Sequence, residues 1–133
     1  MAVALEPMQF TPLVTKDDGG WYAVKVVEFY MMTTSHSNTT KTHANQKVQV
    51  AARGSYEVKS FGDGKGTILD SGTTDTYLPQ DVASSFEKAW LQITGLPVHN
   101  RAHRYTHDDF LNLPDLVLVF ENEVEHAVPA AHY

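Results

Sequence analysis

The sequence predicts one mainly β domain with a single prominent helix. Its 133 residues suit one domain, and 42% hydrophobic with 20% charged residues is ordinary for a folded globular protein. Runs rich in aromatic and β-branched residues, bounded by turn residues, recur along the chain and favour strands. Segment 81–94, by contrast, repeats its apolar residues at helical spacing, which makes it the clearest single element.

The first strands form a predicted hairpin. Trp21–Met32 is rich in aromatic and β-branched residues and is expected to be a strand. It follows the turn sequence Asp17-Asp18-Gly19-Gly20, so that Leu13–Thr15 and Trp21–Val27 are expected to pair across this turn.

The middle of the chain alternates loops with short strands. Segment 33–46 is dominated by Thr, Ser, Asn and His, and we expect a polar surface loop that is longer than the usual connection. Lys47–Ala51 and Ser55–Ser60 alternate in polarity and are predicted as strands. Phe61–Gly66 is a glycine-rich turn, and it feeds a strand at Thr67–Leu69.

The helix at 81–94 has recognisable ends. Asp81 is the predicted N-cap, Gly95 the predicted terminating residue, and Pro97 prevents the helix from resuming. Its apolar face consists of Val82, Phe86, Ala89, Trp90 and Ile93.

The segment Thr67-Ile68-Leu69-Asp70-Ser71-Gly72-Thr73-Thr74 predicts a catalytic carboxylate. Two apolar β-formers place Asp70 at the end of a buried strand, in a tight turn full of hydrogen-bond donors. Donors of this kind hold a carboxylate that must exchange a proton near working pH. Gly72 allows the turn and lets its backbone N–H approach Asp70.

This segment resembles the active-site signature of the pepsin-like aspartic proteases, in the form that their second lobe often carries. The resemblance covers about residues 9–133, with a divergent middle, and implies a pepsin-like β lobe that hydrolyses peptide or protein substrates without metal or cofactor. The flanking segments that match the family's strands and helix start are Phe10–Leu13, Trp21–Val26, Tyr77–Pro79, Leu113–Phe120, and Val128–Pro129 with Tyr133.

The resemblance also implies roles for single residues. Asp70 corresponds to the catalytic Asp of the second lobe, and Ser71 to the turn residue that bonds across to the other lobe. Thr73 corresponds to the donor to the outer carboxylate oxygen, while Gly72 and Thr74 correspond to residues that face the substrate backbone.

Three expected parts of such an enzyme are absent from this sequence. The reaction needs two carboxylates that share a proton, as those of pepsin do, yet no second Asp-Thr-Gly or Asp-Ser-Gly occurs. The flap tyrosine of the first lobe and the downstream apolar-apolar-Gly motif are also missing, since Ile93-Thr94-Gly95 lies at a helix end. We therefore expect a partial domain, inactive alone, that requires an N-terminal lobe with the other Asp.

Two other functions compete with this interpretation. Two copies could each supply Asp70, as in the retroviral-type homodimeric proteases, although the missing apolar-apolar-Gly motif counts against that arrangement. A lobe of this kind could also bind extended peptides without cutting them.

Charge and composition bear on partners and location. A net charge of −6 argues against a nucleic-acid partner, which requires a basic face. The chain has no cysteine, which mildly favours a reducing compartment. The family resemblance outweighs this and implies a secretory, vacuolar, lysosomal-type or extracellular location. No apolar stretch approaches the ~20 residues of a membrane span, and Met1–Phe10 lacks the pattern of a signal peptide.

Some other motifs have ordinary explanations. His99, His103 and His107 recur every four residues, a spacing that could ligate zinc on a helix, but the preceding Gly and Pro favour a solvated basic loop. Gly62–Thr67 lacks the ending of a phosphate-binding loop and is expected to be a hairpin turn. Asp75 is expected to be a solvent-facing strand residue.

Overall fold

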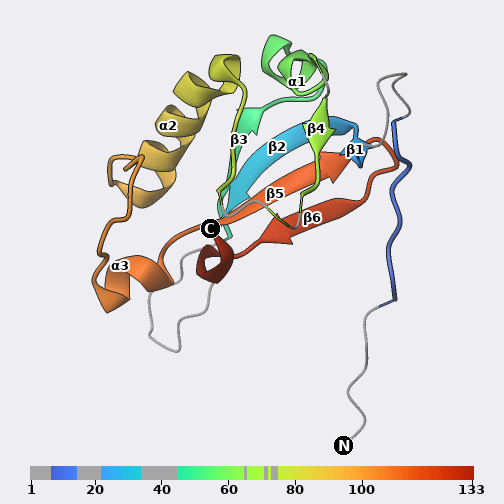
Figure 1. Cartoon of the computed structure of the whole chain (residues 1–133). Coiled ribbons are helices and arrows are strands. Elements are labelled where there is room, and N and C mark those ends of the chain that lie inside the picture. The colour runs from blue at the N-terminus through green and yellow to red at the C-terminus, as the bar shows by residue number, and fades with distance from the viewer. Residues whose placement is uncertain (1–6, 15–21, 34–44, 65, 71, 73–74) are drawn as a thin grey trace, which may run out of the picture.

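The computed structural model describes residues 7–14, 22–33, 45–64, 66–70, 72 and 75–133. These residues form a small mixed α/β fold with two antiparallel sheets and one main helix (Figure 1). The elements are β1 Ala23–Val24, β2 Val26–Met32, β3 Lys47–Ala51, α1 Tyr56–Ser60, β4 Thr67–Ile68, α2 Gln80–Thr94, α3 His107–Leu111, β5 Asp115–Phe120, β6 Glu125–Val128 and a 3₁₀ turn at Ala130–His132.

The larger sheet has the strand order β3-β2-β5-β6, with every neighbouring pair antiparallel. β2 lies at its centre and pairs Met31 with Val48 on one side and with Leu116 on the other. The pairings of β2 shift between Phe29 and Tyr30 and between Val26 and Glu28, where the strand is irregular. The predicted strands at 47–51 and within 113–120 are confirmed by β3 and β5.

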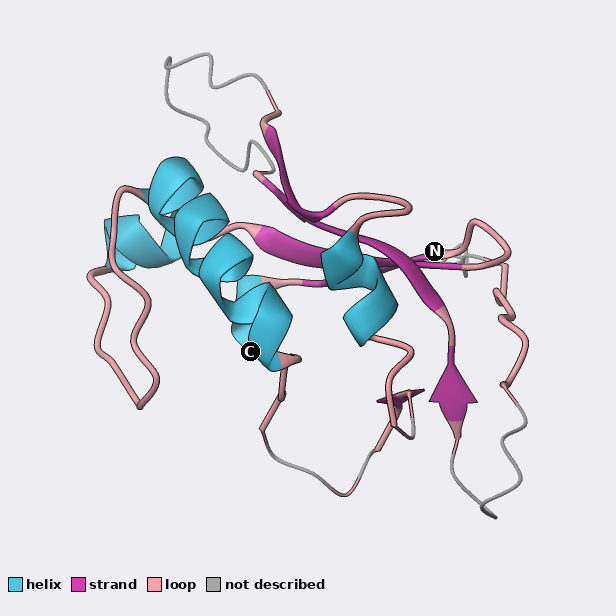
Figure 2. Ribbon diagram, turned by 90° about the horizontal axis from the view of Figure 1, so that it is seen from above, coloured by secondary structure: helices cyan, strands magenta, loops and turns pink. Residues whose placement is uncertain are grey.

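The helices cover one face of this sheet (Figure 2). Phe29 and Met31 alternate with polar residues along β2 and point to the helices, where both are almost fully buried. The ring of Phe29 packs against the rings of Phe61 and Phe86, each 6.1 Å away. Phe86 in turn packs against Trp90, at 6.0 Å, so that aromatic contacts join β2 to both α1 and α2.

Helix α2 confirms the predicted amphipathic face, but it begins at a different residue from the one predicted. Val82, Ala89 and Trp90 are buried against the sheet. Gly95 has a left-handed φ of 72° and its N–H donates to Leu91, so it ends the helix as predicted. The N-cap is Pro79 rather than Asp81, because Asp81 lies in the first turn, where its carboxylate accepts a hydrogen bond from Ser60 in α1.

The predicted strand at Ser55–Ser60 is wrong. Residues Tyr56–Ser60 form the short helix α1, and Ser55 caps it by accepting a hydrogen bond from the Val58 N–H. Alternating polarity cannot distinguish one helical turn from a short strand, whereas a capping serine at the start favours the helix.

The predicted strand at Trp21–Met32 is divided into β1 and β2 at Lys25. β1 belongs to the smaller sheet, where it pairs with β4, Ala23 lying opposite Ile68. Leu13 bridges to Val24 on the other side of β1, which confirms the described end of the predicted hairpin. The turn at 17–20, Trp21 and most of the polar segment 33–46 lie outside the described residues.

The last strands are shorter than expected. β5 begins at Asp115, and β6 ends at Val128, because Pro129 starts a 3₁₀ turn instead of continuing the strand. Tyr133 then folds back: its hydroxyl donates to the carbonyl oxygen of Pro114 at 2.6 Å, and its ring meets the edge of Trp90. The C-terminal residues are therefore held against α2 and β5.

Candidate functional site

Asp70 follows directly after β4, in the smaller sheet. The Leu69 N–H donates to the carbonyl oxygen of Tyr22 at 3.0 Å, so the pairing with β1 continues to the residue before Asp70. Contrary to expectation, this strand is not buried: Thr67 and Ile68 are half-buried, Leu69 is 46% exposed and Asp70 is exposed. Among the described residues this two-residue strand pairs only with β1, so it has too few neighbours to cover both of its faces.

The turn after Asp70 brings a backbone donor to the carboxylate as predicted. The Gly72 N–H donates to Asp70 Oδ1 at 2.8 Å, which is a charge-assisted bond of ordinary length. A Cβ added at Gly72 would lie 3.3 Å from the same oxygen. Glycine therefore allows this close approach, and a larger residue would force the carboxylate to move by a few tenths of an ångström.

The structure describes only some of the other residues in and after the predicted motif. Ser71, Thr73 and Thr74 lie outside the described residues. Asp75 is exposed as expected, but it occupies a bend and not a strand. Tyr77, which follows the motif, is 80% exposed.

The surroundings of Asp70 present apolar side chains to solvent. Tyr22 and Leu69 are neighbours across the small sheet and are 68% and 46% exposed. An exposed carboxylate that accepts a backbone N–H can bind a water molecule or a hydroxyl group. General acid–base hydrolysis additionally needs a second group in the other protonation state, held close to the first.

The three histidines do not form the helical array that their spacing could have produced. His99 and His103 lie in an irregular segment, where their rings stack at 3.7 Å between centroids. His107 is the first residue of α3. Within the described part of the chain, no group of three or more His, Asp or Glu side chains is arranged to hold a metal ion.

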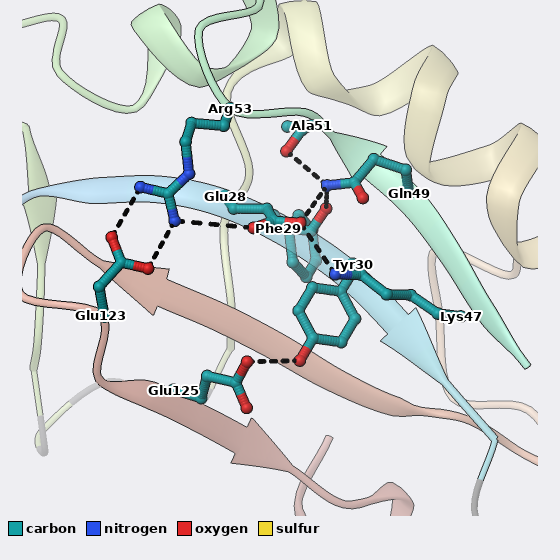
Figure 3. A network of polar contacts seen from close by, with 9 residues as sticks. All are labelled: Glu28, Phe29, Tyr30, Lys47, Gln49, Ala51, Arg53, Glu123 and Glu125. Carbon is teal, nitrogen blue, oxygen red and sulfur yellow. Dashed lines mark hydrogen bonds and ion pairs between the residues drawn. The ribbon is translucent and has the colours of Figure 1, made fainter. Parts of the chain in front are cut away.

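A polar network that the sequence patterns did not indicate lies on the sheet face that the helices leave uncovered (Figure 3). Glu28 is its centre, and its carboxylate accepts hydrogen bonds at 3.0 Å from both Lys47 and Gln49. The Arg53 guanidinium lies 3.9 Å from the same carboxylate. It also forms a bidentate ion pair with the Glu123 carboxylate, with N–O distances of 2.8 and 2.9 Å. Alternation of polar residues along β2 and β3 was the signal that could have revealed it.

The network changes the acidity of Glu28. Burial alone would raise the pKa of this carboxyl. Hydrogen bonds from Lys47 and Gln49, with the charges of Lys47 and Arg53, outweigh burial and hold the pKa below its ordinary value.

Tyr30 lies on the same face of the sheet as Glu28. Its hydroxyl donates to Glu125 on β6 at 3.0 Å, so its ring spans the intervening strand β5, where it is buried with Val117 and Val119. The Lys47 ammonium lies 3.9 Å from the ring centroid. Burial raises the pKa of Tyr30 to about 12, and the bond to Glu125 with the charges of Glu125 and Glu28 acts in the same direction.

A hollow of about 300 Å³ lies away from Asp70, between the end of α2 and α3. Its lining includes Ile93, Thr94, Asp109 and Asn112, but none of the residues predicted to form a site. Among the described residues, no helix has the length and apolar character that crossing a membrane requires.

Comparisons with known proteins do not assign this chain to a family. No family model matches it, and neither the curated proteins nor the solved structures contain a match. The function is therefore inferred from the Asp70 turn itself.

Proposed function

We propose that this chain supplies one of the two catalytic carboxylates of an aspartic endopeptidase, and that Asp70 is that carboxylate. The observation that carries the proposal is the contact between the Gly72 N–H and Asp70 Oδ1 at 2.8 Å. It joins the first and third residues of the Asp-Ser-Gly-Thr-Thr motif through a charge-assisted hydrogen bond, which favours an ionised carboxylate.

The surroundings of this turn support the proposal. The motif follows a strand and precedes a main helix, an order that resembles the second lobe of the pepsin-like enzymes. Asp70 and Gly72 are both exposed, so a water molecule and an extended peptide can reach them. The exposed Tyr22 and Leu69 beside them are suited to contact with a second lobe.

In this proposal, peptide-bond hydrolysis takes place between Asp70 and an Asp on that second lobe. One carboxylate removes a proton from the attacking water, while the other, protonated, donates to the carbonyl oxygen of the scissile bond. The fold has the role of holding Asp70, and an acidic compartment of the secretory route is the expected location.

The test uses the intact natural gene product. Its mass and peptide map should show a mass well above 14.8 kDa and an additional Asp-Thr-Gly peptide, and the product should hydrolyse fluorogenic peptides in acid. Asp70→Asn should lower this hydrolysis by roughly 10²- to 10⁴-fold, the usual contribution of a general acid or base.

Asp75→Asn is the matched control, because Asp75 is an exposed aspartate five residues further along the chain. It should leave the rate unchanged. A product of 14.8 kDa whose rate rises with the square of its concentration would assign the second carboxylate to another copy of the chain. Hydrolysis that survives Asp70→Asn, or no hydrolysis by the intact product at any pH, would refute the proposal.

A further inference from the structure

The two edges of the four-stranded sheet are not equivalent. β3, at one edge, packs against α2. β6, at the other edge, has β5 as its single strand neighbour among the described residues (Figure 1). Glu125, His126 and Ala127 of β6 are all exposed, and Val128 is half-buried.

The hydrogen bonds of the β5–β6 turn show which backbone groups of β6 point outward. The Phe120 N–H donates to the Val124 carbonyl and the Glu123 N–H to the Phe120 carbonyl, each at 2.9 Å. Bonded pairs alternate along an antiparallel ladder, so His126, opposite Leu118, directs its N–H and carbonyl toward β5.

Glu125 and Ala127 therefore direct their N–H and carbonyl groups away from the sheet. Within the described residues, no backbone or side-chain hydrogen bond engages these outward groups.

One usual protection of an edge strand, a row of charged side chains, is largely absent from β6. Charged side chains along the edge are one of the means by which natural edge strands avoid pairing with other chains. Glu125 is the charged residue of β6 that could serve this purpose, but its carboxylate is drawn across the face of the sheet to the Tyr30 hydroxyl. Pro129 ends the exposed row, because it has no N–H to donate.

We propose that β6 pairs antiparallel with β6 of a second copy of this chain, about a two-fold axis at His126. In this register Glu125 lies opposite Ala127 of the other copy. The outward N–H of each residue donates a hydrogen bond to the outward carbonyl oxygen of the residue opposite. Val124 lies opposite Val128, so half-buried apolar side chains meet each other.

A second copy suits this edge because the row is self-complementary. A two-fold axis at His126 places each Glu125 carboxylate beside a small, uncharged Ala127 instead of beside the other carboxylate. Both copies pair through the same residues. The β6 edge of each copy is therefore fully paired in the dimer, and no third copy can add at this edge. The proposal is independent of the Asp70 chemistry.

The test compares two variants that carry opposite charges at one exposed position, residue 127. Sedimentation velocity over a range of concentrations should show a weak monomer–dimer equilibrium, with a Kd of roughly 10 µM to 1 mM, as expected for a short interface. Ala127→Glu sets like charges opposite Glu125 and should raise the Kd at least about tenfold. Ala127→Lys sets opposite charges there and should lower it several-fold.

A third variant removes the hydrogen bonding directly. Ala127→Pro deletes an outward N–H, which an edge strand tolerates, and should abolish the dimer, with circular dichroism confirming the fold. Asp70→Asn should leave the dimer unchanged, which separates this interface from the proposed peptidase site. The proposal would be overturned if the chain stayed monomeric at every concentration, even if it bound an extended peptide at this edge. Equal Kd values for the Ala127→Glu and Ala127→Lys variants would also overturn it.

Discussion

The two sheets of this protein differ in how completely they are covered. The four-stranded sheet is covered on one face by α1 and α2, and on the open face, which the helices leave uncovered, Tyr30, Val117 and Val119 are still buried. Met31 and Ala51 within it are fully buried. The two-stranded sheet that carries Asp70 is half-buried at β4 and exposes Tyr22 and Leu69.

Because of this difference, the residues that determine the stability of the fold are largely distinct from those proposed to carry out the chemistry. Most apolar burial occurs around the four-stranded sheet, so this part should determine the free energy of unfolding. The Asp70 turn contributes little to the core and presents its carboxylate to solvent, so its residues should be replaceable without unfolding the chain. Substitutions in the two sheets should reveal that separation.

The largest effect is expected from Phe29→Ala. Phe29 is 2% exposed and contacts the rings of Phe61 and Phe86, so its loss should lower the free energy of unfolding by about 3–5 kcal/mol. Leu69→Ala, beside Asp70, should lower it by less than about 1 kcal/mol, because Leu69 is 46% exposed. Urea titration of both variants measures this contrast, and equal losses would show that the two sheets do not differ in this way.

An intermediate effect is expected from Glu28→Gln on the open face. At neutral pH it should reduce stability by roughly 1–2 kcal/mol, because the hydrogen bonds from Lys47 and Gln49 would lose their charged acceptor.

The difference between the wild type and Glu28→Gln should depend on pH. The folded-state pKa of Glu28 lies below its ordinary value of 4.5, so the unfolded chain binds the proton more readily. The stabilisation is therefore complete above pH 4.5 and is lost as the pH falls through the lower folded-state pKa. Urea titrations at several acidic pH values should show the two proteins converging, whereas a constant difference would contradict the assigned cause.

The smallest effect on stability is expected from Gly72→Ala. Its new Cβ would lie 3.3 Å from Asp70 Oδ1, which displaces the carboxylate slightly. The melting temperature should change by no more than about 2 °C, since the turn is exposed. Peptide hydrolysis by the intact gene product should nevertheless fall by roughly 3- to 10-fold, because small displacements of catalytic groups are costly. An unchanged rate would show that this contact does not position Asp70.

Local patterns predicted some of the fold well. The helical spacing of Val82, Ala89 and Trp90 identified α2, and Gly95 marked its end. The alternation in 47–51 identified β3, and the motif predicted the bond between Gly72 and Asp70. These features depend on residues close together in the chain, so the sequence contains their causes.

Predictions that depended on distant neighbours were less successful. Residues 55–60 alternate like a strand but form α1, and Asp81 contacts Ser60 in α1 instead of capping α2. The strand before Asp70 was expected to be buried because it is apolar, yet a strand is buried only when other elements cover it.

The amino-acid sequence alone was enough to locate α2, β3 and β5 and to predict the close approach of Gly72 to Asp70, because periodicity and turn chemistry act over a few residues. The folded arrangement was needed to show that Glu28 and Tyr30 share a polar network on the open face of the sheet and that Asp70 is exposed. It was also needed to show that β6 has β5 as its single strand neighbour within the described part of the chain. These properties follow from strand order and register, which bring residues as distant as Tyr30 and Glu125 together. Alternation along one strand indicates which of its residues share a face, but not which strands lie beside it.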